Sequence, residues 1–113
     1  MREDGKIDYV ELPGGALPQV KGFYEQAFGW RFVDYGPEYA AFEDAGLDGG
    51  FHASAEAEPV PLVILFAHDL EAMEAKVVAA GGVVVREIQA FPGGRRFHFR
   101  DPAGNVLGVW SET

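Results

Sequence analysis

Residues 92–105 read PGGRRFHFRDPAGN, and this stretch predicts more of the fold than any other part of the chain. From Arg95 to Arg100, phenylalanines alternate with arginine and histidine, which is typical of a half-buried β-strand. The segment from Asp101 to Asn105 contains Asp, Pro, Gly and Asn, the residues that favour a tight turn. The stretch therefore predicts a strand that ends in a turn, and the apolar residues from Val106 to Trp110 predict the strand that follows.

The residues before this hairpin follow one order of elements twice. In the first half we expect a strand over residues 7–12, a helix from Leu17 to Phe28, and short strands over residues 30–35, 39–43 and 50–53. In the second half we expect a strand over residues 62–67, a helix that begins after Asp69, a strand over residues 83–88 and a loop over residues 90–94. The hairpin completes this second half.

Local residues support the two predicted helices. Pro18 suits a first helical turn, where its missing N–H group is no loss. Gly29 stands where a left-handed glycine commonly ends a helix, and Asp69 can cap the helix that it precedes. Both helices carry an apolar stripe with helical spacing, which predicts that one face of each packs on a sheet.

These elements predict an α+β fold of two tandem β-α-β-β-β modules with curved mixed sheets. We expect one domain over residues 1–113, with a first module over residues 6–53, a connector over residues 54–61 and a second module over residues 62–111. Such a module has one apolar helix face and one sheet, so it cannot bury its core alone. Pairing of the two modules is expected to leave a cleft between their sheets.

Composition excludes several classes of function. The net charge of −9 disfavours binding to nucleic acids and to anionic membranes, which is driven by clustered Lys and Arg. The chain has no Cys, which excludes disulfides, a cysteine nucleophile and thiolate metal sites. No apolar run approaches the roughly 18 residues that span a bilayer, and the N-terminus lacks the apolar segment of a signal peptide, so we expect a cytoplasmic protein.

Four stretches in this order resemble one known superfamily. Residues 9–13 read YVELP, residues 23–30 read FYEQAFGW, residues 69–72 read DLEA, and residues 92–105 end in DPAGN. Together they resemble the vicinal oxygen chelate superfamily of glyoxalases, bleomycin-resistance proteins and extradiol dioxygenases, and in particular its small glyoxalase-like bacterial members. The resemblance covers residues 6–111 and implies the fold described above, together with a homodimer.

The resemblance also implies where a metal ion would bind. Metal-dependent members hold a divalent cation with His, Glu or Gln side chains from the first and last strands of each half. The matching positions here are Tyr9, His52, Leu62 and Gly108. Leu and Gly have no donor atom, and the phenol of Tyr, with a pKa of about 10, is a poor ligand near neutral pH. We therefore expect no metal at this place and no other cofactor, although a rearranged site built on His52, Glu11 and His98 is conceivable.

Three residues are candidates for acid–base chemistry. Glu11 shares a strand face with Tyr9, so it is either a base in the cleft or the partner of Arg96 or Arg100 in a salt bridge. His52 is either a proton carrier that lines the cleft or a half-exposed histidine near a loop. His98 alternates with two phenylalanines, which places it either on the cleft side or on a polar outer face.

Four further residues are candidates for ligand binding. Tyr9 is placed in the cleft by the resemblance. Arg95 and Arg96 follow two glycines and could clamp a carboxylate or phosphate, or they could only balance charge in an acidic protein. Trp110 is either near the end of the cleft or part of the core or of a dimer interface.

Three functions are consistent with these residues, and the third is a partner or regulatory subunit that lacks activity of its own. The first is a binding protein of the bleomycin-resistance kind, which holds a small organic ligand, anionic where the arginines contact it, without a chelated metal. The alternative is a glyoxalase-like lyase or isomerase, or a dioxygenase-related enzyme, that acts on a vicinal carbonyl or diol. Glu11, His52 and His98 would serve as acid and base, or would hold a metal ion in a rearranged site. Whether the protein is an enzyme is left open by the sequence.

Overall fold

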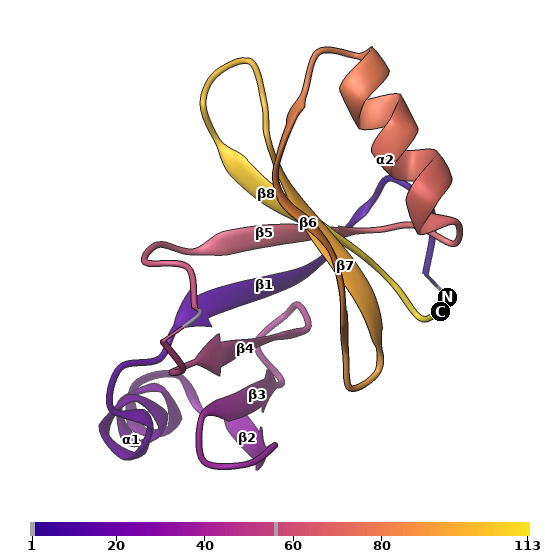
Figure 1. Ribbon diagram of the computed structural model, residues 1–113. Coiled ribbons are helices and arrows are strands. Elements are labelled where there is room, and N and C mark those ends of the chain that lie inside the picture. Colours follow the sequence, from indigo (N-terminus) through magenta and orange to yellow (C-terminus); the bar gives the residue numbers. More distant parts are fainter. Residues whose placement is uncertain (1, 56) are drawn as a thin grey trace. The chain divides into compact units, whose positions relative to one another are not determined.

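The computed structural model describes residues 2–55 and 57–113 and contains the predicted order of elements (Figure 1). Met1 and Glu56 lie outside the described residues, and so do the parts of the predicted N-terminal segment and connector that fall on them. The elements are β1 (Ile7–Pro13), α1 (Leu17–Phe28), β2 (Arg31–Asp34), β3 (Tyr39–Glu43), β4 (Gly49–His52), β5 (Leu62–Phe66), α2 (Leu70–Ala79), β6 (Val83–Phe91), β7 (Gly94–Arg100) and β8 (Val106–Ser111). The α+β class and the repeated β-α-β-β-β order are confirmed.

Both helices begin where local chemistry predicts, and α1 also ends at the predicted residue. In α1, Pro18 lies in the first turn, and Gly29 ends the helix with a φ of 75° while its N–H donates to the carbonyl of Glu25. In α2, the carboxylate of Asp69 accepts the N–H of Ala72 at 3.0 Å, which satisfies one donor of the first turn. Within residues 2–55 and 57–113, neither helix is long and apolar enough to cross a membrane.

The chain divides into two compact units, of which the first comprises residues 9–62. Its strands follow the order β2-β3-β4-β1, in which β1 runs parallel to β4 and the other neighbours are antiparallel. The core lies between α1 and one face of this mixed sheet. It is built from Leu17 of α1 and from Ala40, Phe42 and Phe51 of the strands.

The second unit comprises residues 2–8 together with residues 63–113. Its strands follow the order β5-β8-β7-β6, with β5 parallel to β8. Its core includes Leu70 of α2, Phe97 of β7 and Val109 of β8. The N-terminal segment joins this unit through backbone hydrogen bonds, because Gly5 donates to the carbonyl of Phe66 at 2.8 Å and Phe66 donates to the carbonyl of Lys6 at 3.1 Å.

The predicted turn over residues 101–105 is confirmed. The carboxylate of Asp101 accepts hydrogen bonds from the side chain of Asn105 and from the backbone N–H groups of Asn105 and Ala103. The hydrogen bond from the Asn105 side chain and those from the backbone keep the pKa of Asp101 below its usual value. This turn joins β7 to β8 and fixes their antiparallel register, in which Phe97 faces Val109.

The loop predicted over residues 90–94 is wrong, because β6 continues to Phe91 and β7 begins at Gly94. Only Pro92 and Gly93 connect the two strands, and Ala90 pairs with Arg95. Gly94 serves close packing rather than flexibility, since a Cβ atom there would collide with the carbonyl oxygen of Ser111. The two glycines therefore belong to a paired hairpin, and the strand predicted to end at Ile88 is correspondingly longer.

Candidate functional site

The unit of residues 9–62 carries its polar side chains on one face of its sheet. Leu12 and Phe51 pack on the core beside α1, so the residues that alternate with them point to the opposite face. We call this the helix-free face. Glu11 of β1 and His52 of β4 lie there, together with Tyr9 and Tyr39.

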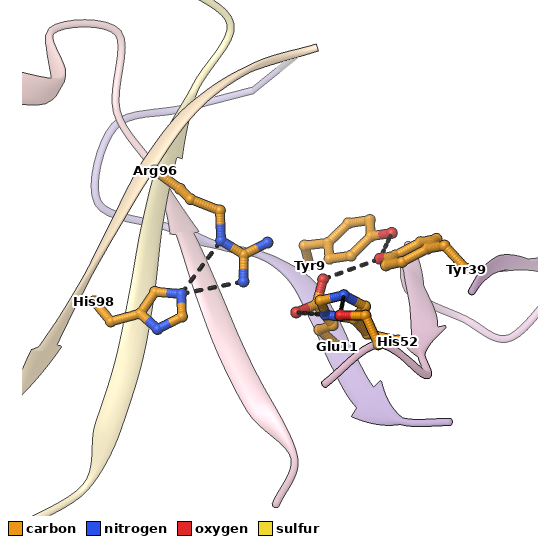
Figure 2. Close-up of polar contacts among 7 residues, drawn as sticks. Tyr9, Glu11, Tyr39, His52, Arg96 and His98 are labelled. Carbon is orange, nitrogen blue, oxygen red and sulfur yellow. Dashed lines mark hydrogen bonds and ion pairs between the residues drawn. The ribbon is translucent and has the colours of Figure 1, made fainter. Parts of the chain in front are cut away.

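These side chains form a continuous chain of contacts, which we call the polar network (Figure 2). The hydroxyl oxygens of Tyr9 and Tyr39 are 2.5 Å apart, and Tyr39 donates to Oε2 of Glu11 at 3.2 Å. Oε1 of Glu11 lies 3.6 Å from Nδ1 of His52, an ion-pair separation that is longer than a hydrogen bond. Nε2 of His52 lies 2.6 Å from the hydroxyl oxygen of Ser54, which completes the network.

The network depends on the register of three strands and on a glycine between them. Glu11 faces Gly50 across the parallel pair of β1 and β4, and Tyr39 faces His52 across β3 and β4. The ring of Tyr39 lies across Gly50, because a Cβ atom there would be 2.5 Å from the ring carbon Cε1. Only glycine at this position lets the phenol reach the carboxylate on the neighbouring strand.

Burying these polar groups costs free energy of folding unless they form hydrogen bonds with one another. Glu11 is 5% exposed, and a carboxylate removed from water to that extent needs hydrogen-bond donors. Tyr39 supplies one of them. Burial, followed by the negative charge of Glu11 and the proximity of Tyr9, raises the pKa of Tyr39 well above its usual value. Tyr39 therefore remains a protonated donor throughout the physiological range.

A test of this environment is an alkaline titration. Because the pKa of Tyr39 is higher in the folded chain than in the unfolded chain, its contribution to stability is present below about pH 10, the unfolded value, and is lost as the pH rises further. Ultraviolet difference absorbance measures the ionisation of the tyrosine side chains. The ionisation of Tyr39 should coincide with unfolding and disappear in Tyr39→Phe. Ionisation of Tyr39 near pH 10 in the folded chain would contradict this environment.

His98 and Arg96 form a pair on β7 of the other unit (Figure 2). Nε and Nη2 of Arg96 lie 3.2 and 3.1 Å from Nε2 of His98. A guanidinium only donates, so Nε2 accepts and the imidazole is neutral with its proton on Nδ1. His98 is buried, at 1% exposure, rather than on an exposed outer face, and Phe97 packs in the core.

The candidate catalytic residues therefore belong to two units. Glu11 and His52 are brought together by residues 9–62, whereas His98 belongs to the unit that contains residues 63–113. A joint role for the three residues stays a prediction.

The other predicted ligand-binding residues have well-defined contacts. Arg95 donates from both terminal nitrogens to the carboxylate of Glu71, at 2.5 and 3.0 Å, and from Nε to the carbonyl of Thr113. The indole N–H of Trp110 donates to Asp8 at 2.9 Å. Arg95 and Arg96 are adjacent in a strand, so their side chains leave opposite faces of the sheet.

The residues at the positions that the resemblance assigned to metal ligands do not fit a chelated cation. Leu62 and Gly108 offer no donor atom, and a Cβ atom at Gly108 would already lie 3.3 Å from His98 and 3.4 Å from Ile64. Tyr9 is hydrogen bonded to Tyr39 as a phenol. Across residues 2–55 and 57–113, no group of three or more His, Asp or Glu side chains is arranged to hold a metal ion.

Tyr39 and Ser54 were not predicted from the sequence to be functional residues. Strand alternation places Tyr39 opposite the core residues Ala40 and Phe42, and this pattern was a usable indication of its face. Ser54 follows His52 by two residues in the expected connector. The contact of Tyr39 with Glu11 depends on the pairing of distant strands, which no local pattern indicates.

Comparisons with known proteins agree with this architecture. The family model described as Glyoxalase/Bleomycin resistance protein/Dioxygenase superfamily matches residues 6–109. No curated protein matches the chain. The Mn(II)-bound glyoxalase from Novosphingobium aromaticivorans aligns at 26% identity and a TM-score of 0.68 over 99% of this chain, which spans 40% of that protein.

Two other solved structures align over nearly their whole length. Methylmalonyl-CoA epimerase from Mycobacterium tuberculosis has 14% identity and a TM-score of 0.74, with 100% of this chain and 91% of that chain covered. A glyoxalase/bleomycin resistance protein/dioxygenase superfamily member from Vibrio splendidus 12B01 has 14% identity and a TM-score of 0.69, with 94% and 97% covered. At these identities, the two similarities show the fold alone.

Proposed function

We propose that this chain, which belongs to the Glyoxalase/Bleomycin resistance protein/Dioxygenase superfamily, binds a small organic molecule through its polar network and without a chelated metal. The observation that carries the proposal is the buried carboxylate of Glu11, held by a phenol and beside an imidazole. Such a group contributes nothing to an apolar core, and its concentration with other polar groups on the helix-free face is typical of a binding site.

The charge of the ligand is part of the proposal. An anionic ligand was expected from Arg95 and Arg96, but the guanidinium of Arg95 makes a bidentate ion pair with Glu71. Arg96, which lies against His98 within its own unit, is proposed as the arginine that contacts a carboxylate or phosphate. A homodimer in the cytoplasm belongs to the same proposal, and light scattering of the purified protein measures the oligomeric state.

The test is a ligand screen by thermal shift on protein treated with a chelator. Carboxylates, phosphates, amines and neutral aromatic compounds form the panel, because any ligand of the folded state raises the melting temperature. Glu11→Gln keeps the shape of the side chain but removes the charge, and we expect it to weaken binding by about tenfold. His68→Gln, which replaces an exposed histidine paired with Asp4, is the matched control and should bind normally.

Two outcomes would overturn this proposal. One is a metal ion present near one per chain, whose removal abolishes binding. The other is a panel in which Glu11→Gln and His68→Gln bind every hit as tightly as the parent.

A second candidate function is proton transfer on a vicinal carbonyl compound, as in a glyoxalase-like lyase or isomerase. The specific observation in its favour is that Glu11 and His52, a potential base and acid, lie 3.6 Å apart in one network. The hemithioacetal of methylglyoxal and glutathione is the substrate to test. Turnover that survives exhaustive chelation and is lost in Glu11→Gln would support this function over simple binding.

A further inference from the structure

We propose that Ser54, His52 and Glu11 form a nucleophile–base–carboxylate triad that hydrolyses small activated esters. The proposal goes beyond ligand binding, because it adds Ser54 and a covalent step. It does not require that the ligand proposed above exists.

The proposal rests on the two contacts made by the imidazole of His52. Its Nε2 atom lies 2.6 Å from Oγ of Ser54, and its Nδ1 atom faces Oε1 of Glu11 at 3.6 Å. A hydroxyl on one ring nitrogen and a carboxylate on the other is the arrangement that activates a serine, and it is recognised by geometry rather than by chain order. The carboxylate contact is loose, as is common before a substrate binds.

The position of Glu11 also selects the reactive tautomer of His52. A carboxylate beside Nδ1 favours a proton on that nitrogen. Nε2 then carries a lone pair and accepts the proton of Ser54, as a general base requires. The same carboxylate stabilises the positive charge that develops on the ring when this proton is transferred.

The exposure of the three side chains fits their roles in a triad. The side chain of His52 is 23% exposed and Ser54 is half-buried, so an ester can approach the nucleophile and the base. Glu11 is buried, which strengthens its interaction with the ring because the local dielectric constant is low. Tyr39 donates to Oε2 and fixes the rotamer of Glu11, so it acts as a positioning residue.

The reaction balances with water as the only co-reactant. Oγ of Ser54 attacks the ester carbonyl while its proton passes to Nε2 of His52, and the resulting tetrahedral intermediate expels the alcohol, which takes the proton from Nε2. Water then attacks the acyl-serine, its proton passes to Nε2, and Ser54 leaves with that proton as the carboxylic acid is released.

The experiment combines covalent labelling with hydrolysis of p-nitrophenyl acetate by the whole chain. A fluorophosphonate should add once per molecule, and peptide mapping should place it on Ser54. The other serine of the chain, Ser111, is fully buried and is an internal control. Ser54→Ala and His52→Gln should each lower kcat by about a hundredfold or more, because both remove the activated nucleophile.

Matched variants separate a triad from nonspecific catalysis. His68→Gln removes an exposed imidazole, which can hydrolyse nitrophenyl esters unaided, and should leave the rate unchanged. Tyr39→Phe should lower kcat with little change in KM, which a purely structural role would not do. Circular dichroism and melting temperature establish that each variant is folded.

The outcomes distinguish this proposal from ligand binding. Loss of labelling and hydrolysis in a folded Ser54→Ala that still binds the ligands of the thermal-shift panel supports both proposals. Loss of hydrolysis without any panel hit supports the triad alone. A fluorophosphonate adduct that is absent or lies elsewhere, or a rate that is unchanged in Ser54→Ala, overturns the triad whatever the panel shows.

Discussion

Gly49→Ala is expected to destabilise the folded chain by about 3 kcal/mol, the upper end of the usual cost of overpacking. A Cβ atom at this position would collide with the carbonyl oxygen of Val10 and with the ring of Phe42. The carbonyl belongs to β1, which pairs with β4 at this point, so it cannot move without shifting the strand. Chemical denaturation measures the change in the free energy of unfolding.

Gly22→Ala is the matched control for this substitution. Gly22 lies within α1 and a Cβ atom there would meet no atom within 4 Å, so alanine should stabilise the chain by about 0.5–1 kcal/mol through helix propensity. Equal effects of the two substitutions would show that the close approach of β1 to β4 is wrong. A folded fraction of Gly49→Ala should also lose ester hydrolysis, because the same strand pair sets the contact of Glu11 with His52.

The second large effect is expected in the other unit, where Phe97→Ala should cost about 3–5 kcal/mol of stability. Phe97 is fully buried and packs with Leu70 of α2 and Val109 of β8, so truncation leaves a cavity that rigid neighbours cannot fill. The shift in the denaturation midpoint, at unchanged slope, measures this loss.

Phe23→Ala provides the comparison for a phenylalanine outside the core. Phe23 is 58% exposed on α1, and its truncation should change stability by about 0.5 kcal/mol or less. A Phe97→Ala chain as stable as Phe23→Ala would mean that the core between α2 and its sheet is assigned incorrectly.

The features that the sequence predicted well are those decided by neighbouring residues. The apolar stripe, Pro18 and Gly29 are sufficient to place α1, and the carboxylate of Asp69 caps α2 through a contact three residues away. The turn that begins at Asp101 is likewise closed by its own side chains. No information from distant strands is needed at these places.

The sequence failed where a distant residue decides the structure. In the sequence, Gly94 resembles a flexible loop residue. In the structure it is required because the carbonyl oxygen of Ser111, on a neighbouring strand, occupies the space of a Cβ atom. The site follows the same rule. Glu11 and His52 were predicted from their residue types. Tyr39 reaches Glu11 only because β4 lies between β3 and β1 and because Gly50, which has no side chain, leaves room for the tyrosine ring.

The N-terminal segment has a consequence for how the chain folds during its synthesis. Residues 9–62 form a contiguous unit that the ribosome delivers in one piece, so this unit can begin to fold while the chain is still growing. The amide of Gly5 has no acceptor until Phe66 has emerged, and Asp4 must also wait for His68. Residues 2–8 thus reach their native positions only after residues 63–68 have been synthesised, and the closure of this long loop favours slow completion of the second unit.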